Sequence, residues 1–145
     1  MKVVVIDDDP TGSQTVHSCP LLLRWDVDTL RRGLRHASPL LFLLADTRAL
    51  TPMAAAERNR GIAAALDQAL QREGLARDQV LLVSRGDSTL RGHGVLEPEV
   101  LQASFGPFDA TFHVPAFLEG GRTTVNGVHL LHGEPVHTTP FAQDR

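Results

Sequence analysis

The sequence is poor in three side chains on which many enzyme mechanisms depend. It has one cysteine, Cys19, so no internal disulfide can form, and it has no tyrosine. Lys2 is the only lysine, which leaves arginine and histidine to supply every cation in the interior. Mechanisms that need an internal lysine are therefore nearly excluded, among them nucleotide binding by a G-x-x-x-x-G-K-[ST] loop, a motif that the sequence also lacks.

Long apolar runs, a signal-peptide pattern and an excess of positive charge are also missing. The longest apolar runs, such as Leu40 to Ala45, are far shorter than the roughly 20 residues that cross a bilayer. The formal net charge is -3, so the composition indicates no basic surface for nucleic-acid phosphates. We expect a cytoplasmic protein without membrane or nucleic-acid partners, and a homo-oligomer is compatible with the sequence.

The composition that remains suffices for one folded domain. The chain has 145 residues, of which 42% are hydrophobic, and this is enough for a single core. No repeat, linker or low-complexity tract divides it. Residues 140–145 carry no pattern typical of a terminating element, which suggests that the chain is truncated.

Apolar runs and capping residues alternate along the chain in the pattern of an α/β fold. The helix signals are an N-capping aspartate, a Thr-Pro start, a glycine stop and a second proline start, at Asp26, Thr51 and Pro52, Gly74, and Pro98. Short apolar runs predict strands at residues 3–6, 21–25, 40–44, 80–83 and 110–114. We therefore predict a three-layer, mostly parallel, Rossmann-like sheet with flanking helices.

The pattern changes near the C-terminal end to a short alternation of Thr, Val, His and Gly. It favours a C-terminal β-hairpin at residues 123–131, followed by a strand at residues 136–138. Three histidines, His129, His132 and His137, occur in this stretch. We interpret them as structural rather than metal-binding residues, because a hairpin would not bring them together and no cysteine cluster accompanies them.

Charged and small polar residues follow the predicted strands at their carboxyl ends. In a parallel sheet these ends lie at one edge, where α/β proteins bind their ligands. We therefore expect four segments to converge at that edge, namely residues 7–9, 46–48, 84–91 and 115–122.

The first of these segments carries three consecutive carboxylates, Asp7, Asp8 and Asp9, before a Pro-Thr-Gly turn. Adjacent carboxylates repel one another, so the cluster is costly unless a cation, a metal or a hydroxyl-rich ligand offsets the repulsion. We interpret the cluster as functional. The alternative is that one acid caps the turn and the others are solvated.

The loop after the fourth predicted strand combines two guanidinium groups, those of Arg85 and Arg91, with three hydroxyls. Arginine forks match carboxylates and phosphates, and hydroxyls add neutral hydrogen bonds, so the loop suits an acid that also carries hydroxyls. The alternative is a surface loop with internal ion pairs. Arg48 could supply another contact with an anion, and residues 115–124 fit an active-site loop and a plain turn equally well.

Four ordered blocks together resemble the four-carbon acid sugar kinase family, and the likeness covers nearly the whole chain. They are an Asp-Asp-x-Thr-Gly turn, a Ser/Asp-Thr-Arg segment, an Asp-Ser-Thr-x-Arg-Gly block and a Pro-Ala-Phe-x-x-x-Gly-Arg-Thr block, at residues 8–12, 46–48, 87–92 and 115–123. The chain departs from the family's pattern where Arg85 replaces a lysine, His93 an asparagine and Leu118 a proline. These departures concern the particular substrate more than the family.

The resemblance implies that residues 1–145 are the sugar-acid-binding N-terminal domain of a two-domain kinase. Such kinases phosphorylate acids of the threonate, erythronate or 3-oxo-tetronate type, using Mg²⁺ and ATP held by a C-terminal domain that we expect to be absent here. Arg85 would take the carboxylate and Asp8 a hydroxyl, while the catalytic base is unknown and no metal ligand is assigned. The resemblance implies the following substrate-binding residues: Asp8, Asp9, Arg48, Arg85, Gly86, Asp87, Ser88, Thr89, Arg91 and Arg122.

Two other functions fit parts of the sequence. Residues 3–11 mimic the apolar strand and Asp-x-Asp-x-Thr motif of haloacid-dehalogenase-type phosphatases, with Asp7 as nucleophile and Asp9 as acid/base. Such enzymes also need a downstream lysine and a late acidic pair, neither of which is evident, and Pro10 replaces their usual glycine. The other alternative is a stand-alone fragment that binds sugar acids without catalysis.

Overall fold

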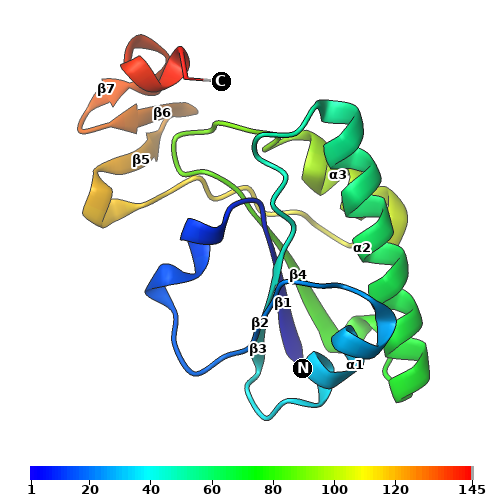
Figure 1. The fold of residues 1–145 in the computed structure, drawn as a ribbon. Coiled ribbons are helices and arrows are strands. Elements are labelled where there is room, and N and C mark those ends of the chain that lie inside the picture. The colour runs from blue at the N-terminus through cyan, green and yellow to red at the C-terminus, as the bar shows by residue number, and fades with distance from the viewer. Residues whose placement is uncertain (145) are drawn as a thin grey trace.

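The computed structural model describes residues 1–144, and its main body is a parallel sheet with helices packed against it (Figure 1). In chain order this body consists of β1 (Lys2–Asp7), β2 (Leu21–Leu22), α1 (Val27–Arg35), β3 (Leu40–Leu44), α2 (Pro52–Glu73), β4 (Val80–Arg85) and α3 (Leu96–Phe105). A small antiparallel sheet follows, made of β5 (Arg122–Val125), β6 (Val128–Leu131) and β7 (Glu134–Pro135). The predicted α/β fold is confirmed.

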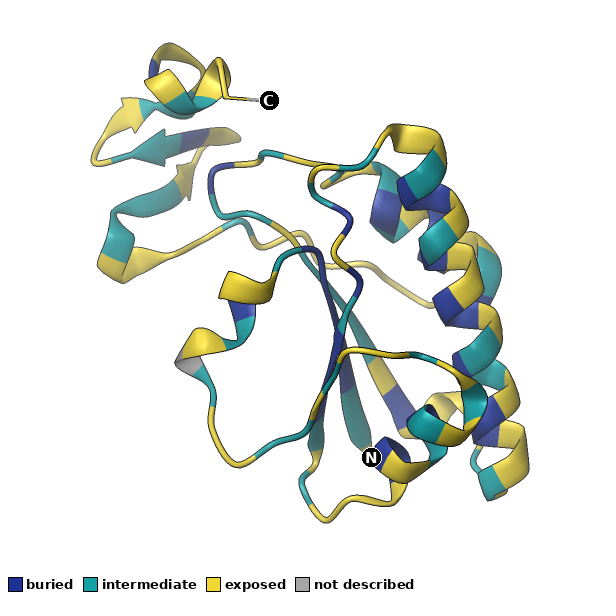
Figure 2. Ribbon diagram, viewed as in Figure 1, coloured by how far each residue is buried: buried dark blue, intermediate teal, exposed yellow. Residues whose placement is uncertain are grey.

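The strands of the larger sheet run parallel in the order β2-β3-β1-β4. β1 lies inside the sheet, and its Asp7 is level with Leu44 of β3 and with Arg85 of β4. Strands covered on both faces are continuously apolar, and Figure 2 shows β1 among the buried parts of the molecule. The carboxyl ends of β1, β3 and β4 therefore share one edge, as the sequence predicts.

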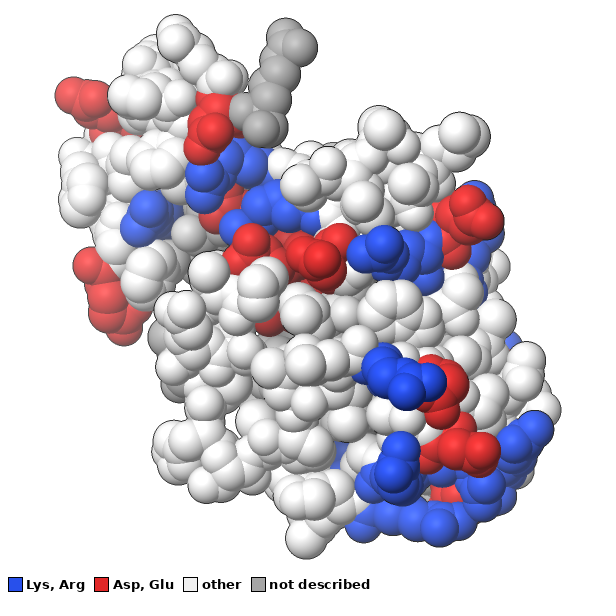
Figure 3. All heavy atoms as spheres, in the orientation of Figure 1, with Lys and Arg blue, Asp and Glu red and all other residues white. Residues whose placement is uncertain are grey.

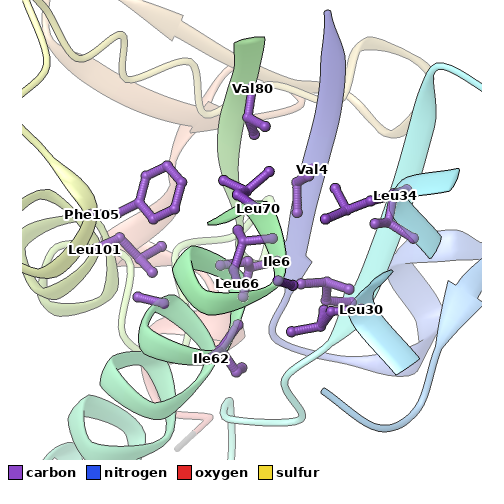
Figure 4. Close-up of a cluster of buried hydrophobic side chains, with 14 of the residues drawn as sticks. Val4, Ile6, Leu30, Leu34, Ile62, Leu66, Leu70, Val80, Leu101 and Phe105 are labelled. Atoms are coloured by element: carbon purple, nitrogen blue, oxygen red, sulfur yellow. The ribbon is translucent and has the colours of Figure 1, made fainter. Parts of the chain in front are cut away.

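The hydrophobic core lies between one face of this sheet and the three α-helices (Figure 4). Val4 and Ile6 of β1 face Ile62, Leu66 and Leu70, which recur at helical spacing along α2. Side chains of α1 and α3 belong to the same core cluster. All three α-helices thus lie on one face of the sheet (Figure 1), so the described residues form two layers of helices and sheet instead of the predicted three.

The predicted boundaries of the first two helices are confirmed by their capping residues. The side chains of Asp26 and Thr51 each accept a hydrogen bond from a backbone N–H three residues further on, at 3.0 and 3.3 Å. Pro52 opens α2, and Gly74 ends it at φ 67°, a left-handed conformation that glycine adopts without strain. α3 begins at Leu96, slightly before its predicted start.

The predicted fifth strand, at residues 110–114, is wrong. This stretch has no strand partner, and its apolar side chains lie exposed, Phe112 with 88% of its surface. Strand propensity produces a strand only where an edge accepts the backbone hydrogen bonds and a face covers the side chains, and neither condition is met here. β4 is consequently an outer strand of the described sheet.

The predicted C-terminal hairpin is confirmed, with β5 and β6 paired antiparallel. Its two-residue turn, Asn126 and Gly127, has φ angles of 50° and 77°, which are typical of the type I′ turn that fits the twist of a hairpin. Residues 136–138 form a turn of 3₁₀-helix instead of the predicted strand. β7 ends at Pro135, which has no N–H with which to continue the pairing.

Three smaller observations complete the description. Of the predicted strand at residues 21–25, only the first two residues pair with β3. Pro140–Ala142 form a further 3₁₀ turn, whereas Arg145 lies outside the described residues. Among the residues described, no helix combines the length and the apolar character needed to span a membrane.

Leu66→Ala should lower the free energy of unfolding by about 2–5 kcal/mol, because Leu66 is fully buried and its truncation leaves a cavity under α2. Leu81→Ala is the matched control, since about half of that side chain is exposed, and should cost about 1 kcal/mol or less. Urea unfolding followed by circular dichroism measures both variants. Equal losses would contradict the placement of the core on the helical face.

Candidate functional site

The carboxyl ends of β1, β3 and β4 bring the predicted acids and arginines together. Backbone hydrogen bonds continue past the strands, from the N–H of Asp8 to the carbonyl of Arg85 at 3.1 Å and from the N–H of Thr47 to the carbonyl of Asp8 at 2.9 Å. Asp8 therefore lies between the loop after β3 and the end of β4. Figure 3 shows acidic and basic atoms side by side where the parallel sheet meets the small sheet.

Asp8 and Arg48 form a two-pronged ion pair. Arg48 Nη2 donates to Asp8 Oδ1 at 2.8 Å and Arg48 Nε donates to Asp8 Oδ2 at 3.0 Å, while Arg48 Nη1 lies 3.3 Å from Asp9 Oδ2. The side chain of Asp8 is only 1% exposed, so Arg48 compensates a carboxylate that water barely reaches. Acids of this chain thus engage all three nitrogens of Arg48.

Asp7 and Arg85 form a second ion pair beside the first. Arg85 Nη1 donates to Asp7 Oδ1 at 3.1 Å, whereas Asp7 Oδ2 has no hydrogen-bond partner among the described residues. Burial raises the pKa of Asp7, and the charge of Arg85 opposes only part of that rise. The phosphatase hypothesis needs Asp7 as an accessible nucleophile, and the complete burial of this side chain argues against it.

Asp87 holds the loop after β4 in shape. Its Oδ2 accepts hydrogen bonds from Arg91 Nε and from Thr89 Oγ1, each at 2.5 Å. Burial alone would raise the pKa of Asp87, but the hydrogen bonds from Arg91 and Thr89 outweigh it and lower the pKa to about 2. Arg91 Nη1 also donates to Asp144 Oδ2 at 2.5 Å. The charges of Asp87 and Arg91 are therefore compensated by ion pairs within the chain, as expected for the alternative interpretation, a surface loop with internal ion pairs.

Glycines let the same loop lie close to the Asp8–Arg48 pair. Gly92 has φ 81°, and a Cβ atom there would lie 3.2 Å from Arg48 Cγ and 3.4 Å from Asp8 Oδ2. A Cβ atom on Gly86 would lie 4.0 Å from the same Asp8 oxygen. The structure thus brings residues 86–92 together with Asp8 and Arg48.

Arg122 lies on the small sheet and contacts two phenyl rings. Its guanidinium carbon is 5.4 Å from the ring centroid of Phe117 and 5.8 Å from that of Phe141. The guanidinium carbon of Arg91 lies 5.2 Å from the centroid of the same Phe141 ring. Among the described residues Arg122 makes no ion pair, so it joins the predicted site only through Phe141 and Arg91.

His129 connects the small sheet to the loop after β4. Its Nε2 donates to the carbonyl of Ser88 at 2.7 Å, and its Nδ1 lies 2.9 Å from Thr124 Oγ1. The imidazole is buried, so these two contacts satisfy both of its nitrogens away from water. His129 thus fixes the backbone of Ser88 and does not engage the Ser88 hydroxyl.

The acids at this edge do not fit a resident Mg²⁺ ion. Mg²⁺ takes oxygen ligands in near-octahedral geometry, and the carboxylates of Asp8, Asp9 and Asp87 accept hydrogen bonds from arginines or hydroxyls instead. Within residues 1–144 no group of three or more His, Cys, Asp or Glu side chains is arranged to hold a metal ion.

A buried polar pair between α2 and α3 was missed from the sequence. Asn59 Nδ2 donates to Glu97 Oε1 at 3.3 Å, and both side chains are buried. Burial raises the pKa of Glu97, and the negative charge of Asp8 contributes to the rise. Asn59 could have been noticed, because it occupies a position on the apolar stripe of α2. Glu97 resembles an ordinary acid in the first turn of a helix, and nothing in the sequence marks it.

Among the described arginines at this edge, Arg85 keeps more of its nitrogens free than Arg48 or Arg91 does. Acids engage three nitrogens of Arg48 and two of Arg91, whereas Arg85 uses Nη1 alone. Within the described part of the chain, Nε and Nη2 of Arg85 have no partner, and its side chain is 38% exposed. Two parallel N–H groups on one edge of a guanidinium form the donor set for a carboxylate. The site can therefore accept a small anion at Arg85.

Two comparisons with known proteins bear on this arrangement. The family described as sugar-binding N-terminal domain matches residues 3–145. Over 151 aligned residues the chain is 31% identical to D-erythronate kinase from Heliobacterium modesticaldum, and the alignment covers 99% of this chain and 32% of the relative. The chain thus spans about a third of the length of this curated relative.

We expect Asp87→Asn to lower the free energy of unfolding by about 2 kcal/mol at neutral pH and by much less near pH 2. Folding lowers the pKa of Asp87 from 3.8 to about 2, and each pKa unit corresponds to about 1.4 kcal/mol. This stabilisation is complete above the unfolded-state pKa and is lost as the pH falls through the folded-state pKa. Urea unfolding across this pH range measures the difference between wild type and variant.

Asp28→Asn is the control for this experiment, because Asp28 forms an exposed ion pair with Arg31. Such pairs contribute about 0–1 kcal/mol, so the control should differ little from wild type at any pH. A gap between wild type and Asp87→Asn that stayed constant down to pH 2 would rule out the ionised Asp87 carboxylate as its source.

Proposed function

We propose that this chain, which belongs to the sugar-binding N-terminal domains of the four-carbon acid sugar kinase family, is the substrate-binding part of an ATP-dependent kinase for a four-carbon sugar acid. The observation that carries the proposal is the free donor edge of Arg85 at the carboxyl ends of the strands. Family membership supports a sugar ligand, and the kinase relative supports phosphoryl transfer. The free guanidinium edge adds a reason for the sugar to be an acid.

Arg85 distinguishes an acid from a neutral sugar. A carboxylate accepts two parallel hydrogen bonds from Nε and Nη2, and charge-assisted bonds of this kind are about twice as strong as neutral ones. Arg48 and Arg91 are less suited to this role, because Asp8, Asp9, Asp87 and Asp144 already accept their hydrogen bonds or lie within ion-pair distance. Their role is instead to position the acids and the loop beside Arg85.

The hydroxyl groups of the acid have acceptors and donors beside Arg85. Asp9 is 25% exposed and Asp8 is 1% exposed, so Asp9 is the better acceptor for a ligand hydroxyl. Asp9 Oδ1 accepts a hydrogen bond from the backbone N–H of Thr11. Asp9 Oδ2, which lies beside Arg48 Nη1, is therefore the oxygen that would accept a hydrogen bond from a ligand hydroxyl. The backbone N–H of Gly86 and the hydroxyl of Ser88 are donors in the loop that follows Arg85.

ATP and Mg²⁺ would be held outside these residues. The kinase relative is about three times as long as this chain, and the chain contains no phosphate-binding loop with a lysine. In the reaction, a hydroxyl oxygen of the acid bonds to the γ-phosphorus of ATP as the bond to ADP breaks, and the hydroxyl proton departs to a base. This chain would orient the acid for that step and would bind it without turnover on its own.

Calorimetric titration of the chain with erythronate and threonate tests the proposal. We expect at least one of these acids to bind, and erythritol, a neutral alcohol with the same number of carbons, to bind more weakly by at least tenfold. Arg85→Gln should weaken acid binding by at least tenfold, because hydrogen bonds to a charged group contribute about 1.5–3 kcal/mol. Arg24→Gln alters an exposed arginine and should leave acid affinity unchanged. A folded chain that bound neither acid would refute the proposal.

A further inference from the structure

We infer that Asp7 is a positioning residue for anion binding, which fixes the Arg85 guanidinium by one nitrogen so that its opposite edge faces the ligand. The inference rests on the proposed function, because it concerns how the same site presents Arg85 to an acid. Asp7 is not among the residues predicted to bind the acid, and the argument for it comes from its pairing, its burial and the turn that covers it.

The sheet itself places the two residues against each other. Asp7 and Arg85 are level with one another on the neighbouring parallel strands β1 and β4, so their side chains leave the same face of the sheet. Arg85 Nη1 donates to Asp7 Oδ1 at 3.1 Å. The contact is therefore built into the register of the two strands and does not depend on a loop.

Gly12 covers the bonded end of the pair. A Cβ atom at this position would lie 1.9 Å from Arg85 Nη1 and 2.3 Å from each carboxylate oxygen of Asp7. No side chain fits in that space, so the backbone of the turn after β1 packs directly on the ion pair. The Arg85 guanidinium is thus covered at Nη1, whereas Nε and Nη2, the edge that can receive a carboxylate, have no hydrogen-bond partner among the described residues.

Burying the Asp7 carboxylate costs free energy that a purely structural role does not explain. Its side chain is fully buried, and its Oδ2 atom has no hydrogen-bond partner among the described residues. A buried ion pair with an unsatisfied oxygen contributes little to stability, and apolar residues of similar volume often do as well or better. With no exposed surface, Asp7 does not touch a ligand directly, so it acts on the site through Arg85.

The chemistry of the guanidinium group suits this division of contacts. An arginine has nitrogens on two sides of a rigid plane and can bind a buried carboxylate with one side and a ligand carboxylate with the other. A lysine ammonium at position 85 would be one compact charge on a flexible stem, and its orientation would not be fixed by the contact with Asp7. The pattern of the family has a lysine at this position, so Arg85→Lys should retain affinity for the acid, but that affinity should no longer depend on Asp7.

Calorimetric titration with erythronate or threonate, whichever binds wild type more tightly, tests the role of Asp7. Asp7→Ala removes a negative charge near the anion, so charge alone predicts tighter binding, whereas loss of positioning predicts binding weaker by about tenfold or more. Asp7→Asn keeps an oxygen that can accept from Arg85 Nη1, and should recover most of the lost affinity. Asp28→Ala, which removes an exposed acid elsewhere, is the matched control and should equal wild type.

A second readout keeps the test independent of whether Asp7→Ala folds. In ¹⁵N-labelled wild-type protein without ligand, the N–H signal of Arg85 Nη1 should be protected from exchange with water, and Gly12→Ala should abolish that protection and weaken acid binding. The inference would be overturned if folded Asp7→Ala bound the acid as tightly as wild type does. It would also be overturned if Asp7→Asn lost as much affinity as Asp7→Ala, or if the N–H of Arg85 Nη1 exchanged freely in wild type. Failure of wild type to bind any acid would instead refute the proposed function, and the exchange measurement would still decide whether Asp7 fixes Arg85.

Discussion

The ion pair between Asp8 and Arg48 is the interaction on which the carboxyl edge of the sheet depends. It joins the end of β1 to the loop after β3, and Gly92 brings a second loop against it at a distance that leaves little room for a side chain. Asp8 is almost entirely withdrawn from water, so loss of Arg48 would leave a buried charge without compensation, at a cost of about 3–5 kcal/mol. Asp9 lies 3.3 Å from the same guanidinium, so the pair also fixes the charge beside that acid.

Arginine has two different roles at this edge, and because Lys2 is the only lysine, arginines fill both of them. Arg48 and Arg91 neutralise acids of the chain itself and shape the loops. Arg85 is held at one nitrogen, and its other donors have no partner among the described residues. Planar guanidinium groups can do both, because their donors point in fixed directions from one delocalised charge. Arg85 is thus a guanidinium group with unused donors beside a cluster of acids, which is the feature that the proposed function relies on.

Much of this organisation could be predicted from the sequence, because the signals were local. The Asp26 and Thr51 caps and the Gly74 stop fixed two helices, and the apolar runs fixed β1, β3 and β4, whose ends had to meet at one edge. The exposed stretch at residues 110–114 could not be foreseen, because strand formation there depends on a partner edge and not on propensity.

The pairing of acids with arginines within the site also escaped prediction. The sequence places Asp7, Asp8, Arg48 and Arg85 at one edge, but which acid binds which arginine follows from strand register and from the path of the loops. The sequence therefore assigns no arginine partner to Asp7 and presents it as a member of the acidic cluster or as a nucleophile, the second of which its burial argues against. Glu97 lies in the interior because of how α3 packs against α2, a tertiary contact without a local signature.

His129 ties the small sheet to the body of the molecule. One imidazole spans from Thr124 on β5 to the backbone carbonyl of Ser88, two residues after Gly86 in the loop that borders Arg85. The hairpin cannot swing away without pulling on that carbonyl, and the loop cannot relax without releasing the hairpin. The two segments are therefore coupled, and a contact that stabilises the loop also stabilises the hairpin.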